Sequence, residues 1–259
     1  MRYFILLSYN GAAFRGWQIQ PDAPSVQQTL GEALSVLLHE KVEVTGAGRT
    51  DTGVSAIGYT AHFDTLCADV QGEGFRCKLN AILNKSVVVH AIFPDPRHAR
   101  FDAVRREYTY FLHRSKDPFV ADRSWLCTYP LDFEAMNRAA ALLAGTHDFS
   151  CFEKTGGNRK TPVCTVYEAR WIPYEPDHVR LMGYPGGTHW YFRIAANRFL
   201  RNMVRAVVGS LIEVGRGRFA PEWIGTLLDG GGTRSDAGTS VPGHALFLSG
   251  VSYGPETDK

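Results

Sequence analysis

A glycine-rich loop at residues 46–56 constrains this chain more than any other feature. It reads Gly-Ala-Gly-Arg-Thr-Asp-Thr-Gly-Val-Ser-Ala and lies between strand patterns at 42–45 and 58–63. Glycines let the backbone take positive φ values and let another group approach closely. The loop therefore presents Arg49 and Asp51 between two strands, where catalytic side chains are often found. A fixed, ionised carboxylate is a candidate nucleophile or general base. The same residues would also fit an ordinary turn with a surface Arg–Asp pair and no catalytic role.

Strand and helix patterns alternate through both halves of the chain. Runs of aromatic, aliphatic and β-branched residues, with alternating faces at 105–113, predict further strands at 3–9, 87–92, 105–113, 163–171, 179–182, 189–195 and 245–253. Helical periodicity and capping signals predict helices at 26–37, 76–83, 133–144, 197–214 and 221–228. Hairpins occur beside crossovers, which favours an α+β fold over a doubly wound one. We predict two β-α-β modules, residues 1–102 with the glycine-rich loop and residues 103–259, that form a mixed, largely antiparallel sheet with helices on one side.

Composition describes an ordinary globular protein. The 259 residues are 44% hydrophobic and 21% charged, and no apolar stretch approaches the length of a membrane span. The apolar run at the N-terminus is too short for a signal peptide. The five cysteines are scattered, with no C-x-x-C motif, which favours reduced thiols and a cytoplasmic location. His147 and Cys151 have no second ligand pair at zinc spacing, so no metal site is predicted.

Basic residues cluster although the net charge is only +2. One cluster lies at 97–106 and includes Arg106. On the predicted helix 197–214, Arg198, Arg201 and Arg205 stand at i, i+3 and i+7 on one face. Aromatic residues such as Phe101 are interleaved with these clusters, a pattern that suits RNA with unstacked bases. A solvated arginine face explains the helix nearly as well, but that face has no interleaved acid, which slightly favours phosphate contact.

Several segments resemble one enzyme family in the same order along the chain. The loop is similar to the G-R-T-D-A-G-V-H-A signature of the TruA-type tRNA pseudouridine synthases. Other similar segments are Tyr9-Asn-Gly11 with Phe14-Arg-Gly-Trp-Gln18, Ser25-Val-Gln27, Arg97-His-Ala-Arg-Phe-Asp-Ala103 with Arg106-Glu-Tyr108-Thr-Tyr110, Gly145-Thr-His-Asp-Phe-Ser150, residues 199–215 around Met203-Val-Arg205, and Ala245-Leu-Phe-Leu248. Thr52 and Ser55 depart from the family, which usually has Ala and His there.

The resemblance implies a function and roles for particular residues. The family isomerises uridine to pseudouridine in the tRNA anticodon arm, at nucleotides 38 to 40, without cofactor or metal. It works as a homodimer that binds tRNA in a central cleft. By analogy Asp51 is the catalytic aspartate, and Arg49 pairs with it and helps to hold the flipped base. Tyr108 packs on the uracil. The residues expected to bind substrate are Arg205, Leu246, Arg198, Arg201, Phe101 and Arg106.

Two alternatives remain open at the level of sequence. A non-catalytic RNA-binding or chaperone protein could use the same fold, and the altered residues Thr52 and Ser55 leave room for it. A hydrolase that cleaves N-glycosidic bonds would need an activated water and often a second carboxylate, and no partner for Asp51 is evident nearby.

Overall fold

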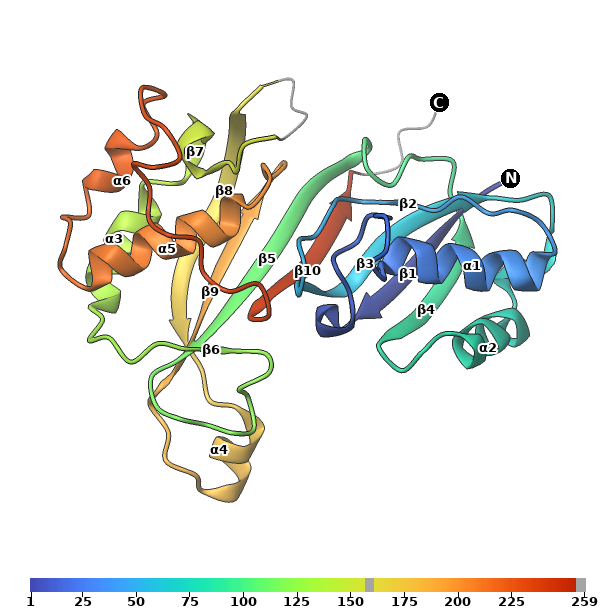
Figure 1. The fold of residues 1–259 in the computed structure, drawn as a ribbon, viewed down its shortest axis with the longest axis horizontal. Helices are drawn as coiled ribbons and strands as arrows, with labels where there is room; N and C mark the ends of the chain where they lie inside the picture. The colour runs from blue at the N-terminus through green and yellow to red at the C-terminus, as the bar shows by residue number, and fades with distance from the viewer. Residues whose placement is uncertain (157–160, 255–259) are drawn as a thin grey trace. The chain divides into compact units, whose positions relative to one another are not determined.

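The computed structural model describes residues 1–156 and 161–254, which form two compact units (Figure 1). Unit 1 comprises residues 1–105 together with the described residues from Phe247 on, and unit 2 comprises Arg106–Leu246. The chain passes between the units within β5 (Ala103–His113) and at the start of β10 (Leu246–Tyr253). The expected division after Asp102 lies close to the first crossing. The C-terminal strand, expected in the second module, lies almost entirely in unit 1.

Unit 1 is a sheet with two helices. Its strands are β1 (Arg2–Tyr9), β2 (Thr45–Gly46), β3 (Ser55–Asp64), β4 (Val87–Pro94) and β10. β1 is antiparallel to both β4 and β3, and β10 runs parallel to β3. The helices are α1 (Val26–Leu38) and α2 (Glu73–Ile82), which pack against each other, and α2 also packs on β4. Tyr3, Ile5 and Leu7 alternate along β1 and are fully buried, as the strand period requires.

The predicted strand at 42–45 is wrong except for Thr45, which begins the two-residue β2. The backbone of Val42 and Val44 forms hydrogen bonds with side chains of α1, where a strand would bond a neighbouring strand. The Ser35 hydroxyl accepts the N–H of Val42 at 3.0 Å, and the Gln27 amide donates to the carbonyl of Val44 at 2.8 Å. The segment leading into the glycine-rich loop is therefore fastened to α1.

Unit 2 has four main strands in the order β5-β9-β8-β7, with β6 parallel to the end of β5. The strands other than β5 are β6 (Trp125–Leu126), β7 (Gly145–Asp148), β8 (Val163–Pro173) and β9 (His189–Ala196). The helices are α3 (Phe133–Ala141), α4 (Asp177–Met182), α5 (Met203–Gly215) and α6 (Trp223–Thr226). α3 packs on β8 and against α5, whose side chains are almost all buried.

Two predicted elements of unit 2 are wrong. Residues 179–182, predicted as a strand, form the end of α4, which starts after Pro176 and stops at Gly183 with a φ of 69°. Proline before a helix and glycine after it are ordinary helix boundaries, and they outweigh the short run Val179-Arg-Leu-Met182. The helix predicted from 197 begins only at Met203, because Asn202 has a left-handed φ of 64°. Arg198 and Arg201 therefore lie outside the helix, and the predicted three-arginine face does not exist.

The predicted α+β class with a mixed, largely antiparallel sheet is confirmed: the described residues contain ten strands and six α-helices. None of the helices in residues 1–156 and 161–254 is both long and apolar enough to span a bilayer.

Candidate active site

The glycine-rich loop rests on three packed aromatic side chains in unit 1. The ring of Trp17 lies 4.3 Å from that of Tyr59, and the ring of Tyr9 lies 5.6 Å from Tyr59. All three are buried. The phenol of Tyr59 donates to the carbonyl of Gly48, and the phenol of Tyr9 bonds the Thr50 hydroxyl at 2.8 Å. The backbone on both sides of Arg49 is therefore held by the core of the unit.

Two glycines outside the loop let a second segment pass against it. A Cβ on Gly16 would stand 2.5 Å from the carbonyl oxygen of Thr50, and the φ of Gly16 is +99°. A Cβ on Gly11 would stand 2.2 Å from the carbonyl oxygen of Val54. Neither gap admits a side chain, so segment 11–17 and the loop fit together only with glycine at both positions.

Asp51 begins a turn in the glycine-rich loop. Its carbonyl accepts the N–H of Val54 at 3.1 Å, and its side chain is partly exposed, whereas Arg49 is exposed. Arg49 thus lies two residues before Asp51 on the same loop and is open to solvent, and the pairing of the two side chains stays a prediction.

Ser55, one of the two departures from the family signature, has a structural role. Its side chain is buried, and its hydroxyl accepts the backbone N–H of Gly11 at 3.0 Å. Thr52, the other departure, is exposed. The serine thus ties the loop to segment 11–17, while the threonine faces solvent.

We predict that Ser55→Ala lowers the free energy of unfolding by about 1–3 kcal/mol, because the buried N–H of Gly11 loses its acceptor. Urea denaturation measures this effect. Thr52→Ala, an exposed change three residues away, is the matched control and should stay within about 0.5 kcal/mol of the parent protein. Equal stability of the two variants would show that the Ser55 hydroxyl does not anchor the loop.

A small pocket opens beside the loop within unit 1. It has a volume of about 110 Å³ and is lined by Trp17, Gln18, Gln27, Thr45, Gly46, Gly48, Arg49 and Arg100. Two of these side chains are guanidinium groups, so the pocket favours an anionic or strongly polar occupant.

Phe101 projects from a tight turn next to Arg100. Its side chain is 75% exposed, and its ring stacks on His98 at 4.2 Å between centroids. The turn is closed by Asp102, whose carboxylate accepts the N–H of His98 at 2.6 Å. An exposed ring on a rigid turn, with the Arg100 guanidinium 5.9 Å away, is typical of a platform for an unstacked base.

Arg97, although it belongs to the same basic cluster, is a structural residue. It forms an ion pair with Asp95, which is only 3% exposed, and donates to the carbonyl of Gly254 at 3.1 Å. Hydrogen bonds from Arg97 lower the pKa of Asp95 although burial alone would raise it. The basic cluster therefore contains one half-buried arginine, Arg97, that is bound to a buried carboxylate, beside the exposed Arg100.

The remaining predicted site residues lie in unit 2. Tyr108, on β5, is half-buried and meets the ring of Phe199 edge-on at 5.0 Å. Arg106, two residues earlier, donates to the carbonyl of Asn197 at 2.9 Å. Leu246 is buried. The structure thus brings Tyr108 and Arg106 to the segment that precedes α5.

Arg205 lies in the first turn of α5 and is fixed by its backbone neighbours. Its Nε donates to the carbonyl of Val241 at 2.7 Å, and its own carbonyl accepts the N–H of Val241. Burial raises the pKa of Tyr110 above its ordinary value, and the positive charge of Arg205 acts in the opposite direction. Arg205 is therefore a partly buried, positioned cation.

Arg198 and Arg201 each donate to a backbone carbonyl of unit 2. Arg198 donates to the carbonyl of Thr161 at 2.7 Å, and Arg201 to that of Thr155 at 3.2 Å. Both arginines thus already bond backbone in this structure, and Arg201 is exposed.

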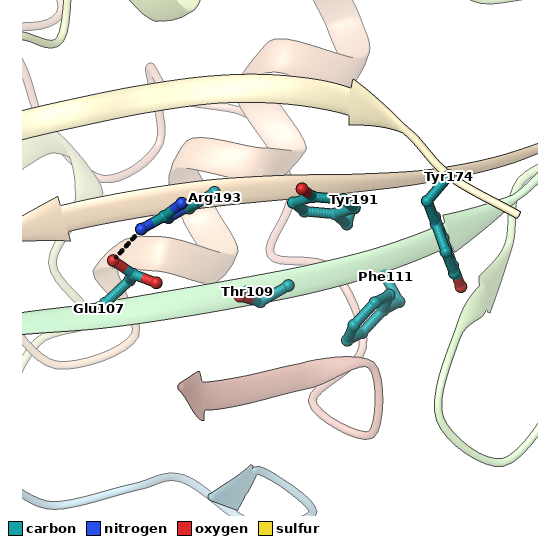
Figure 2. A pocket seen from close by; sticks show the side chains of 6 residues that line it. All are labelled: Glu107, Thr109, Phe111, Tyr174, Tyr191 and Arg193. Carbon is teal, nitrogen blue, oxygen red and sulfur yellow. Dashed lines mark hydrogen bonds and ion pairs between the residues drawn. The ribbon is translucent and has the colours of Figure 1, made fainter. Parts of the chain in front are cut away.

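A larger pocket lies on the sheet of unit 2, with a volume of about 340 Å³ (Figure 2). It is lined by Glu107, Thr109, Phe111, Tyr174, Tyr191 and Arg193. Arg193 pairs with Glu107 at 2.8 Å, and the ring of Phe111 lies 5.4 Å from that of Tyr174. Because its two charges neutralise each other, this pocket offers less for catalysis than the loop that carries Asp51. Thr109 and Phe111 lie two residues apart on β5, and this spacing alone gives no sign of a pocket.

Comparisons with known proteins agree with the motifs. The family model described as tRNA pseudouridine synthase matches residues 139–254. The chain is 45% identical over 257 residues to tRNA pseudouridine synthase A of Porphyromonas gingivalis, covering 97% of each chain. It is also 45% identical to the protein of that name from Parabacteroides distasonis, covering 98% of this chain and 97% of the other.

A third relative, tRNA pseudouridine synthase A of Bacteroides fragilis, is 42% identical over 258 residues, covering 98% of this chain and 97% of the other. The fold, the loop and these matches define a pseudouridine synthase. Within that class, the chain belongs to the tRNA pseudouridine synthase A family.

Proposed function

We propose that this protein isomerises uridine to pseudouridine in tRNA. The observation that carries the proposal is Asp51, a carboxylate on a loop held by Tyr9, Trp17 and Tyr59 in a chain of this family. In the reaction the N1–C1′ bond of uridine breaks, the uracil turns, and a C5–C1′ bond forms. The proton leaves C5, and N1 gains one, so no other reactant is consumed.

Asp51 is the catalytic group of the proposed reaction. Three roles fit a carboxylate here: attack on C1′ of the sugar, attack on the base, or removal of a sugar proton. Arg49 contacts the flipped nucleotide, and Tyr108 packs on the uracil and serves proton transfer. Flipping costs a few kcal/mol and is easiest near a loop, which suits a target in the anticodon arm, nucleotides 38 to 40 by family analogy.

Loss of tritium from tRNA labelled at C5 of uridine tests the proposal. Isomerisation releases this label, whereas binding alone and hydrolytic release of uracil both retain it. Label that stays in the nucleotide during tRNA binding would support the alternative of a non-catalytic RNA-binding or chaperone protein. The three relatives described above carry the names of synthases, which favours the enzyme.

The proposed tRNA contacts predict a steep salt dependence. Arg100, Arg106 and Arg198 are candidates for phosphate contacts, and Phe101 for stacking. If about four phosphates are neutralised, affinity should fall about 100-fold between roughly 50 and 200 mM salt, because bound counterions are released. Filter binding at several salt concentrations measures the slope, and a nearly constant affinity would exclude a phosphate-based grip.

The protein acts in the cytoplasm as a C₂ homodimer, in which one protomer grips tRNA that the other modifies. Family resemblance supports this assembly, and so do basic residues on both units, since one flipped nucleotide needs fewer. We predict a dimer in sedimentation velocity runs of the active protein. A monomer that keeps full activity at nanomolar concentration would rule out the cross-subunit grip.

A further inference from the structure

Three side chains of metal-binding type meet in unit 2, and none of them is a predicted site residue. Asp117 follows β5, His178 lies in α4, and His189 begins β9. One carboxylate oxygen of Asp117 lies 2.6 Å from Nε2 of His178 and 3.0 Å from Nε2 of His189. All three ligand atoms lie within 4.8 Å of one another.

The cluster is closed on most sides. The side chains of Asp117 and His189 are 0% and 1% exposed, whereas that of His178 is 15% exposed. The rings of Phe119 and Tyr184 lie 5.2 and 5.8 Å from His178. His178 is therefore the most exposed of the three side chains.

Outer contacts orient the ligand atoms. The second carboxylate oxygen of Asp117 accepts the backbone N–H of Phe119 at 2.9 Å. Nδ1 of His189 lies 3.3 Å from the Thr188 hydroxyl, so its Nε2 is directed at Asp117. Histidines that bind metals usually have their other ring nitrogen fixed in this way.

Charge favours a cation at this point. Asp117 is fully buried, and within residues 1–156 and 161–254 no lysine or arginine pairs with it. A buried carboxylate is costly unless an opposite charge accompanies it. A divalent ion would supply that charge and leave both imidazoles neutral.

We propose that Asp117, His178 and His189 bind one divalent first-row metal ion of the zinc type, with water as a fourth ligand on the side of His178. Bonds of about 2.0–2.1 Å in tetrahedral geometry put donor atoms about 3.3 Å apart. The 2.6 and 3.0 Å separations reach this value through small side-chain movements. The ion joins the segment after β5 to α4 and β9, so its role is structural, and it takes no part in isomerisation.

Zinc binding to the tag-free full-length protein tests the proposal. After removal of metal with a chelator, equilibrium dialysis against Zn²⁺ at neutral pH should give one bound ion per chain. Zinc at about 100 times its dissociation constant should raise the thermal midpoint by at least ~5 °C. Cobalt in place of zinc should give the visible absorption of a four-coordinate site.

Asp117→Asn and His178→Gln should each lower zinc affinity at least ~10-fold. His90→Gln, a change at an exposed histidine of unit 1, is the matched control and should bind one ion. His178→Gln changes the most exposed of the three ligands and so perturbs the fold least. Its zinc affinity can therefore be measured even if Asp117→Asn fails to fold. Parent protein that retains no zinc, or variants that bind it as the parent does, would overturn the proposal and leave a hydrogen-bonded His–Asp–His cluster.

Discussion

Asp51→Asn is expected to lose at least about 1000-fold in turnover while it binds tRNA as well as the parent protein does. Asparagine has the shape of aspartate but no negative charge, so it can neither attack carbon nor accept a proton. Removal of one anion from a surface that binds a polyanion cannot weaken electrostatic attraction. The loop should keep its form, because its anchors are the Tyr9, Thr50 and Tyr59 hydroxyls.

Tritium release measures the turnover of Asp51→Asn, and filter binding measures its affinity for tRNA. Thr52→Ala, at the exposed next residue, is the control and should react at close to the parent rate. Clear tritium release by Asp51→Asn, or by Asp51→Ala, would show that another group carries the reaction.

The loop is the part of the site that local sequence predicts best. Its three glycines and its place between strands mark it without further information. Its support could not be predicted, because Tyr9, Trp17 and Tyr59 come from three separate segments. The bond from Gly11 to Ser55 likewise joins residues 44 positions apart. Such contacts depend on how the strands pair and not on any local pattern.

Errors in the fold have the same origin. A run of aromatic and aliphatic residues located β1, and helical periodicity located α1, which buries one face. Periodicity is less informative where the backbone leaves the regular helix. It failed at 197–202, where Asn202 turns the chain into a left-handed conformation that apolar spacing does not reveal. It also could not separate Arg97, which is bound to the buried Asp95, from Arg100, an exposed neighbour of the same charge. Charge runs predict a basic surface only after buried ion pairs have been removed from them.

Arg49 is the second residue whose replacement should nearly abolish turnover. Arg49 is exposed and lines the pocket beside the loop. We therefore expect it to act on the bound nucleotide, by holding the flipped base and its phosphate where Asp51 can reach C1′ or the ring. Misplacement by about 1 Å costs on the order of 100-fold in rate. Arg49→Ala should thus lower kcat about 100-fold, with a smaller change in KM.

Lysine at position 49 should not restore the rate. An ammonium keeps the charge but lacks the planar fork that binds two acceptors at once, so the nucleotide would stay attracted but poorly oriented. Single-turnover tritium release by Arg49→Lys and Arg49→Ala separates these effects. Arg100→Ala is the matched control, because Arg100 lines the same pocket but belongs to the turn of Phe101, and its loss should raise KM more than it lowers kcat. If Arg49→Lys turned over at close to the normal rate, charge alone would suffice, and the orienting role assigned to Arg49 would be wrong.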